Sequence, residues 1–227
     1  SLVEGAALPI PTKTGYTFAG WYENPEFSGD PVKDVPTDST ENLNFYAKWT
    51  VNTYTISADV TPEGAGTVTV NSGTSATVEA GTEVTLSATA NSGYCFVGWV
   101  DQSGQSVSSD NPFTFVATSD STFTAKFEKV YTVTVNVSGG GMATADKTTA
   151  AAGEAVTLTA TPNSGYHFTG WTSSDGVTFA NASSESTTFT MPAGDVTVTA
   201  GFTRISSGST TYAITAPDAE NGTVRVS

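Results

Sequence analysis

The sequence is poor in cysteine and in basic residues, and each of these two shortages excludes a class of function. Its 227 residues include one cysteine, Cys95, and one histidine, His167. A single thiol cannot form a disulfide within the chain or a metal centre with several thiolate ligands. Lys and Arg number 8 against 22 Asp and Glu, so the formal net charge is −14. Because a phosphate backbone repels such a chain, we expect no nucleic acid among its partners.

Long apolar runs and charged residues are also scarce. No hydrophobic stretch approaches the ~18 residues of a membrane-spanning helix, so we expect no membrane insertion of this fragment. No signal peptide opens the chain and no anchor closes it, and we expect it to be a piece of a longer protein. Charged residues make up only 13 % of the chain, so Thr, Ser, Asn and Gly must supply the polar surface. The Thr- and Val-rich stretches favour strands over helices.

What the sequence does contain is a repeated aromatic phrase. The pattern Gly-Tyr-x-Phe-x-Gly-Trp occurs at residues 15–21, 93–99 and 165–171, so the copies start 78 and 72 residues apart. Chance does not plausibly place three copies of five fixed residues, including tryptophan, in so short a chain. A period of this length exceeds the ~20–50 residues of solenoid repeats and predicts separate small modules.

Other elements recur around the phrase in the same order. An Ala-Gly turn and a Val/Thr/Leu run precede the second and third copies, at residues 80–88 and 152–160. Each unit closes on an aromatic residue, which is Trp49, Phe127 or Phe202. The repeated order identifies whole structural units, because both the beginning and the end of each unit recur.

The recurrence divides the chain into residues 1–50, 51–128, 129–204 and 205–227. The first segment lacks an opening strand, because only about eight residues precede Pro9. The last segment combines a Ser/Gly-rich linker of flexible composition with the first hairpin of a truncated further repeat. A unit of about 75 residues is near the lower limit for an independent hydrophobic core.

Alternation of apolar and polar side chains is the main secondary-structure signal. Residues 84–88, 133–137, 156–160 and 196–200 each carry Val, Leu or Ala on one face and polar residues on the other, which predicts half-buried strands. Gly-rich and Asn-Gly segments supply turns. The best place for a short helix is residues 25–36, although the prolines there argue against one. The predicted fold class is therefore mainly β, with tandem small β-rich modules arranged as beads on a string.

The repeated phrase is expected to fill the core of each module. Its Tyr and Phe point to one face by alternation, and the following glycine permits a bulge that returns the tryptophan to that face. Aromatic rings bury much area per residue, which a small module without a disulfide needs. The predicted structural core comprises Tyr16, Phe18, Trp21, Trp49, Tyr94, Phe96, Trp99, Phe127, Tyr166, Phe168, Trp171 and Phe202.

The phrase and the closing aromatic residues resemble a known family. Residues 9–50, with Pro-Thr-Lys-Thr-Gly-Tyr-Thr-Phe-Ala-Gly-Trp-Tyr and the closing Tyr-Ala-Lys-Trp, look like the B-repeat of internalin-type bacterial surface proteins, the Listeria–Bacteroides repeat. Residues 54–127 and 131–202 are similar to its divergent form, and residues 211–227 look like the start of another divergent copy. The resemblance implies β-grasp-like modules, export, and display in tandem arrays on the bacterial cell surface or cell wall. It implies no catalytic residues.

Catalytic chemistry is not indicated by the residues themselves. Cys95 and His167 occupy the variable position of two copies of the phrase, in different modules, whereas a catalytic Cys-His pair must lie within hydrogen-bond reach. The turn carboxylates lack a partner at a repeated spacing, unlike a glycosidase pair. The oxygen-rich loops do not match the 12-residue acidic calcium loop, and bound calcium stays a minor alternative. We predict no enzymatic activity, no metal site and no cofactor.

Aromatic residues outside the repeated positions are the best candidates for a ligand surface. These residues are Tyr22, Phe27 and Phe45. Because the tryptophans are all accounted for by repeated positions, the sequence favours a structural role for them. A ligand surface is predicted, if anywhere, on the first segment.

Three functions are compatible with these predictions. The first is a non-catalytic spacer or stalk of a secreted or cell-wall-displayed bacterial surface protein with a role in adhesion. The second is a module that binds a glycan, a host protein or a surface protein directly. The third is an accessory region of a secreted hydrolase. Open sheet edges expected at both chain ends also predict strand exchange or a head-to-tail contact between copies.

Overall fold

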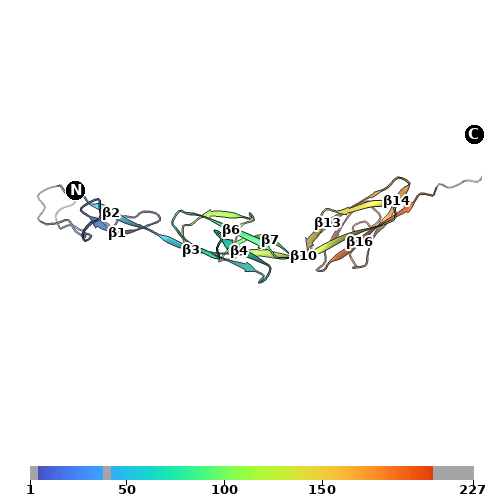
Figure 1. Cartoon of the computed structure of the whole chain (residues 1–227), viewed down its shortest axis with the longest axis horizontal. Coiled ribbons are helices and arrows are strands. Elements are labelled where there is room, and N and C mark those ends of the chain that lie inside the picture. The colour runs from blue at the N-terminus through green and yellow to red at the C-terminus, as the bar shows by residue number, and fades with distance from the viewer. Residues whose placement is uncertain (1–4, 38–41, 207–227) are drawn as a thin grey trace, which may run out of the picture. The chain divides into compact units, whose positions relative to one another are not determined.

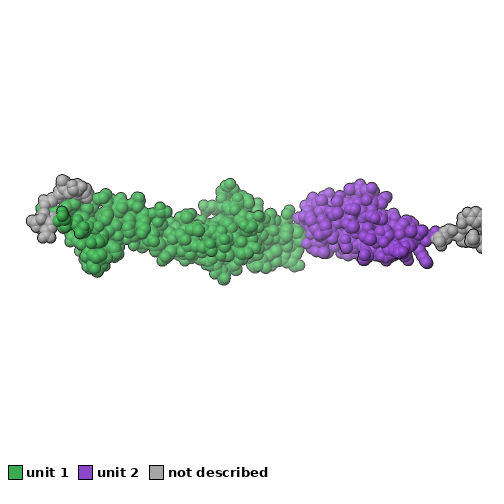
Figure 2. Space-filling model, turned by 90° about the horizontal axis from the view of Figure 1, so that it is seen from above, with its two compact units in different colours: residues 1–130 green, residues 131–227 purple. Residues whose placement is uncertain are grey.

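The computed structural model describes residues 5–37 and 42–206 (Figure 1). The chain divides into two compact units, residues 1–130 and 131–227 (Figure 2). The described residues form strands, bridges and turns but no helix, which confirms the predicted mainly β fold class. Accordingly, no helix in the described part of the chain is suited to crossing a membrane. Residues 25–36 form turns, bends and isolated bridges, so the position favoured for a short helix is not helical.

Most of the predicted fourth segment, from residue 207 onward, lies outside the described residues. The expected hairpin there and the expected exchange of strands between copies therefore stay predictions. The described residues form three modules, which we call the first (residues 5–51), the second (residues 53–130) and the third (residues 131–206) modules. The first two belong to the first compact unit, and the third belongs to the second unit.

The first module contains a single two-stranded antiparallel sheet. Its strands are β1 (Tyr16–Tyr22) and β2 (Tyr46–Val51). Among the described residues of this module, only Tyr22 is buried. The module therefore has almost no solvent-excluded core of its own.

The second module is a two-layer β-sandwich. One layer has the strand order β5-β3-β10-β7-β8, and the other has the order β4-β6-β9. Side chains from both layers form one core cluster, which includes Ile56, Leu86 and Trp99. The strands are β3 (Thr53–Thr61), β4 (Gly66–Val70), β5 (Ser75–Glu79), β6 (Glu83–Ala90), β7 (Tyr94–Asp101), β8 (Ser106–Ser108), β9 (Phe113–Val116) and β10 (Ser121–Ser138), of which residues 121–130 belong to this module.

The third module repeats this architecture. The last part of β10 pairs with β12 and β16, and β16 pairs with β14, while β11-β13-β15 form the second layer. Leu158, Trp171 and Val198 are among the buried residues of its core cluster. The remaining strands are β11 (Gly141–Ala145), β12 (Thr149–Ala151), β13 (Ala155–Pro162), β14 (Tyr166–Ser173), β15 (Ser186–Thr190) and β16 (Val196–Arg204).

The predicted alternation along the strands is confirmed. In β6, Val84, Leu86 and Ala88 are buried while the residues between them are not. In β16, Val196 and Val198 are buried in the same way. β6 is the middle strand of its three-stranded layer, and β16 lies between β14 and β10 in the larger sheet. One face of each strand therefore packs on the core.

The bulge predicted within the repeated phrase is present in all three modules. The pairing register shifts at Ala19 in β1, at Val97 in β7 and at Thr169 in β14. An extra residue at this point lets the Phe and Trp on either side of it share one face. Phe96 and Trp99 have their ring centroids 5.5 Å apart as a result.

The first glycine of the phrase has a backbone role. Gly15, Gly93 and Gly165 have φ values of 77°, 82° and 83°, which side chains with a Cβ rarely adopt. The carbonyl oxygen of Gly93 accepts a bond from the N–H of Val130 (2.9 Å) at the end of the second module. Corresponding bonds close the first and third modules, at 2.9 and 2.7 Å. This glycine therefore recurs because it permits the turn that brings each module's last strand into place.

Candidate functional site

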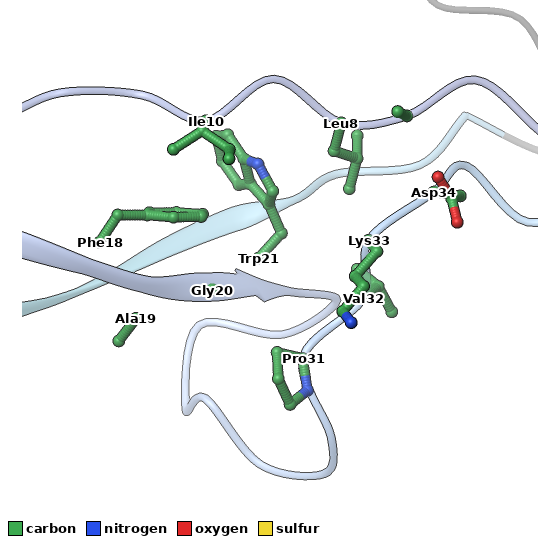
Figure 3. Close-up of a pocket in the computed structure, with 11 residues that line it drawn as sticks. Leu8, Ile10, Phe18, Ala19, Gly20, Trp21, Pro31, Val32, Lys33 and Asp34 are labelled. Carbon is green, nitrogen blue, oxygen red and sulfur yellow. The ribbon is translucent and has the colours of Figure 1, made fainter.

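An apolar groove of about 510 Å³ opens on the first module (Figure 3). Its walls come from residues 7, 8, 10, 18–21 and 31–34. Ile10, Trp21 and Pro31 give the walls their apolar character, and Lys33 and Asp34 are the only charged residues in them. The groove is a concave and mainly apolar surface, which is the usual character of a ligand site, so we take it as the candidate functional site.

Three hydrogen bonds hold the walls of the groove together. The indole N–H of Trp21 donates to the carbonyl oxygen of Pro9 (2.7 Å). The backbone N–H of Leu8 donates to the carbonyl of Lys33, and that of Val32 donates to the carbonyl of Trp21, both at 2.8 Å. The indole thus fixes the segment before β1, although no regular strand forms there.

Gly20 lets one wall of the groove approach β1. Its φ is +132°, and a Cβ at this position would lie 2.7 Å from Cβ of Pro31. Because that distance is too short for two carbon atoms, a larger residue would push the loop away from the strand. The second glycine of the phrase therefore has a packing role here.

The side chains that line the groove suit binding, and they do not form an arrangement of catalytic groups. Ile10 is 80 % exposed at its rim. A neighbouring hollow of about 610 Å³ shares Ile10 and extends to Trp49. There the Lys13 ammonium lies 3.9 Å from the centroid of the Tyr16 ring, a cation–π contact. The first hollow is mainly apolar, whereas the second mixes aromatic residues with polar ones such as Thr12, Lys13 and Thr17.

The residues nominated for ligand binding lie elsewhere on the first module. Tyr22 is buried and packs edge to face on Phe27, with centroids 5.6 Å apart. The Lys48 ammonium lies 5.1 Å from the Tyr22 centroid and 5.8 Å from that of Phe27. Phe45 is half-buried. The structure thus brings two of the three together, and none of the three lines the groove.

Sequence reasoning missed the groove because its key residues lie outside any periodic pattern. Leu8 and Ile10 flank Pro9 in a segment without regular strand structure. Pro31 and Val32 come from the loop where a short helix was considered. The only available signal was an apolar run, Ala-Leu-Pro-Ile, that no strand accounts for.

The predicted core residues of the second and third modules are buried or half-buried. Trp99 is fully buried and Trp171 is 3 % exposed, and the closing Phe127 and Phe202 are also buried. The indole N–H groups donate to backbone carbonyls, that of Trp99 to Asp110 (3.1 Å) and that of Trp171 to Ser184 (3.0 Å). The other four predicted core residues of these modules, all half-buried, are Tyr94, Phe96, Tyr166 and Phe168.

The first module departs from this arrangement. Phe18 contacts Trp21 and Trp49, with centroids 5.5 Å apart in both pairs. These three residues are only half-buried. Tyr16 is 38 % exposed, so its assignment to a core is wrong. The physical reason is that no second β-layer covers β1 and β2 among the described residues.

Aspartates in the loops of the larger sheets hold strand ends. A carboxylate oxygen of Asp120 accepts a bond from the N–H of Thr55 (2.7 Å). Asp195 does the same for Thr132 (2.8 Å) in the third module. These two aspartates are exposed, and they recur as strand-end caps in the second and third modules.

Two further carboxylates have altered acidity. A hydrogen bond from the Ser103 hydroxyl, followed by one from the Gln105 backbone, lowers the pKa of Asp101. A hydrogen bond from Lys147, followed by one from the Ala151 backbone, lowers the pKa of Glu154. Both are local turn interactions, and neither carboxylate lines the groove of the first module. Among the described residues, no three His, Cys, Asp or Glu side chains are grouped to hold a metal ion.

Comparison with known families gives the fold its context. The divergent InlB B-repeat domain matches residues 54–130 and 131–206, and the Listeria-Bacteroides repeat domain matches residues 4–48. The chain belongs to the InlB B-repeat family. The second and third modules are divergent B-repeats, the first is a Listeria–Bacteroides repeat, and the resemblance seen in the sequence is confirmed. The chain is thus a repeat region of the bacterial surface-protein type.

Two curated relatives share parts of this B-repeat chain. Internalin H of Listeria monocytogenes is 34 % identical over 93 residues, which cover 40 % of this chain and 15 % of that protein. A protein of Evansella cellulosilytica that carries the name of a membrane protein is 30 % identical over 168 residues, covering 71 % of this chain and 23 % of its own. The B-repeat chain therefore spans less than a quarter of either relative.

A solved structure with some likeness is a bacterial adhesin from Mobiluncus mulieris that contains intramolecular disulfide, isopeptide and ester cross-links. The match covers 84 % of this chain and 85 % of that one at 13 % identity. Its TM-score is 0.26, which is too low to support any inference.

Proposed function

We propose that this B-repeat region is a non-catalytic spacer of a secreted or surface-displayed bacterial protein that takes part in adhesion. The observation that carries the proposal is that aromatic and acidic side chains at equivalent positions of the two divergent repeats serve the fold. The indoles of Trp99 and Trp171 are buried and bonded to the backbone. The carboxylates of Asp120 and Asp195 are bonded to strand ends. Side chains that serve the fold in this way are not available for catalysis.

The surface of the divergent repeats also suits a spacer. Their exposed strand positions are dominated by Thr and Ser, and the net charge of the chain is strongly negative. Lys147 and Glu154 form an ion pair on the surface of the third module. Like-charged copies repel one another, which keeps neighbouring surface proteins apart.

A scattering experiment tests the spacer proposal. A compact globule of 227 residues has a radius of gyration of roughly 17 Å. A spacer must hold its two ends apart, so small-angle X-ray scattering of the chain should give a clearly larger value. A radius near that of a compact globule would contradict the proposal.

A second candidate function is direct binding of a glycan or a host protein through the first module. The observation that favours it is the apolar groove beside Trp21. A glycan array and a host-protein pull-down with the chain, and with Ile10→Glu, test this candidate. Met142→Glu is the matched control, because Met142 is an exposed apolar residue (64 %) of the third module. Binding that Ile10→Glu abolishes and Met142→Glu retains would establish the second function; no binding by the parent chain would refute it.

A further inference from the structure

The first and last strands of each divergent repeat are parallel neighbours. We propose that this strand pair makes each divergent repeat a mechanical clamp, which resists unfolding when the chain is pulled from its two ends. The inference rests on the proposed spacer function for its biological meaning, because a spacer between a cell and its target carries tension. The mechanical property itself follows from the strand order.

In the second module, the clamp consists of β3 and the first part of β10. Six residue pairs are in register, from Ile56 opposite Ser121 to Thr61 opposite Lys126. The Ser57 and Thr122 hydroxyls also form a hydrogen bond across the pair (2.9 Å). Because the chain enters at the start of β3 and leaves at the end of β10, tension drives the two parallel strands past each other.

In the third module, the last part of β10 and β16 form the equivalent pair. Again six residue pairs are in register, from Val133 opposite Val196 to Ser138 opposite Gly201. The Asp195 carboxylate accepts a hydrogen bond from the backbone N–H of Thr132, just before the first of these pairs. The same topology therefore occurs twice in the chain.

The direction of the load decides how the hydrogen bonds break. In an antiparallel hairpin pulled at its open end, the bonds lie along the force and break one after another. In a parallel pair pulled at opposite ends, the bonds lie across the force and share it, so many must break together. A concerted rupture has a higher barrier, and forced unfolding is governed by the barrier to unfolding.

Neighbouring strands and the core reinforce each clamp. β3 also pairs with β5, and β10 pairs with β7 in the second module, so neither clamp strand is an edge. In the third module β12 and β14 flank the pair in the same way. Ile56 and Val198 are both fully buried beneath the clamps. Sliding the strands would therefore also expose the core to water.

The first module provides an internal comparison. Its sheet consists of one antiparallel pair, β1 and β2, and no parallel pair occurs among its described residues. If the clamp is the source of mechanical resistance, this module should yield at lower force than the other two.

Pulling the full chain from its termini by atomic force microscopy is the first test. Two high-force events are expected, each releasing roughly 250 Å of chain before the folded length is subtracted, since an extended residue spans ~3.3–3.6 Å. The first module should unfold earlier, without a comparable force peak. The absence of high-force events would overturn the proposal.

Changing the direction of pulling separates the clamp from general stability. Ser164 is exposed in the turn before β14, and Tyr166 lies opposite Arg204 in the β14–β16 pair. A handle on Ser164→Cys, used with the C-terminal handle, peels these antiparallel strands apart from one end. Cys95→Ser removes the competing thiol in the variants pulled in both directions. We expect terminal pulling to need about twofold more force or more than this geometry at equal loading rate.

The outcomes distinguish the inference from the function on which it rests. Equal forces in the two geometries would overturn the clamp and leave the spacer proposal standing. A directional difference in force, together with a compact scattering radius, would support the clamp and contradict the spacer. Circular dichroism of the cysteine variants confirms that they are folded before they are pulled.

Discussion

The first module and the divergent repeats share one aromatic phrase but use it differently. Trp171 is 3 % exposed inside a two-layer sandwich, whereas Trp21 is half-buried beside an open groove. Both indoles bond a backbone carbonyl, at 3.0 and 2.7 Å. The phrase therefore dictates the local bulge and the indole bond in both settings. Whether its aromatic residues are buried in a core depends on a second β-layer. Among the described residues, only the divergent repeats have such a layer.

The largest expected effect comes from removing the phrase's tryptophan. Trp171→Ala should destabilise the third module by about 3–5 kcal/mol, because it leaves a large cavity in a core. Trp21→Ala should cost the first module only about 1–2 kcal/mol, because its side chain is half-exposed. Hydrogen exchange with mass spectrometry, resolved by module, measures both values on the full chain. Equal losses of stability in Trp171→Ala and Trp21→Ala would contradict the difference in burial between the two modules.

Adding a methyl group to the core should have the next largest effect. A Cβ on Gly141 would overlap the ring of Phe202, so Gly141→Ala should destabilise the third module by about 1–3 kcal/mol. Gly194→Ala is the matched control, because a Cβ there meets nothing within 4 Å and Gly194 has no positive φ. The control should be neutral or slightly stabilising.

The same hydrogen-exchange experiment measures the stability of the third module in both glycine variants. A loss in Gly194→Ala equal to that in Gly141→Ala would show that close packing on Phe202 is not the reason for the glycine.

Removing a strand cap should have a smaller effect. Asp195→Ala takes away the acceptor for the Thr132 N–H and should cost about 1 kcal/mol or less, since water replaces part of the bond at an exposed site. The loss should speed exchange at the start of the third module's part of β10. The control is Asp30→Ala, which changes an exposed aspartate of the first module. It should leave exchange at the start of the third module's part of β10 unchanged. Unaltered exchange in Asp195→Ala would contradict the capping role.

The smallest expected effect is on pH dependence. The pKa of Asp101 is lowered in the folded chain, chiefly by the hydrogen bond from the Ser103 hydroxyl. The ionised carboxylate therefore stabilises the fold at pH values above its ordinary pKa. This stabilisation is lost as the pH falls through the lowered pKa of the folded chain. The loss should therefore occur below about pH 4. Asp101→Asn should be slightly less stable than the parent at pH 6, with a difference that shrinks in acid. Thermal unfolding at pH 6 and pH 3 measures it, and a constant difference would contradict the assignment.

Much of the fold was accessible from the sequence because its signals are local. Alternation at residues 84–88 places Val84 and Leu86 on one face whatever lies opposite them. The bulge at Val97 was predicted from Gly98, which stands between Phe96 and Trp99 in the phrase. The groove was not accessible, because Ile10 and Pro31 come from irregular segments that only the folded chain brings together.

The sequence by itself determined the mainly β fold class, the repeat, the bulge and the family, because each can be recognised from the order of residues along the chain without knowing which segments touch. Only the tertiary structure decided which copies of the phrase are buried, and that the first and last strands of a divergent repeat lie side by side in parallel. The physical reason is that burial and strand pairing depend on what covers a surface. The parallel pairing of Ile56 with Ser121, for example, joins residues 65 positions apart in the chain.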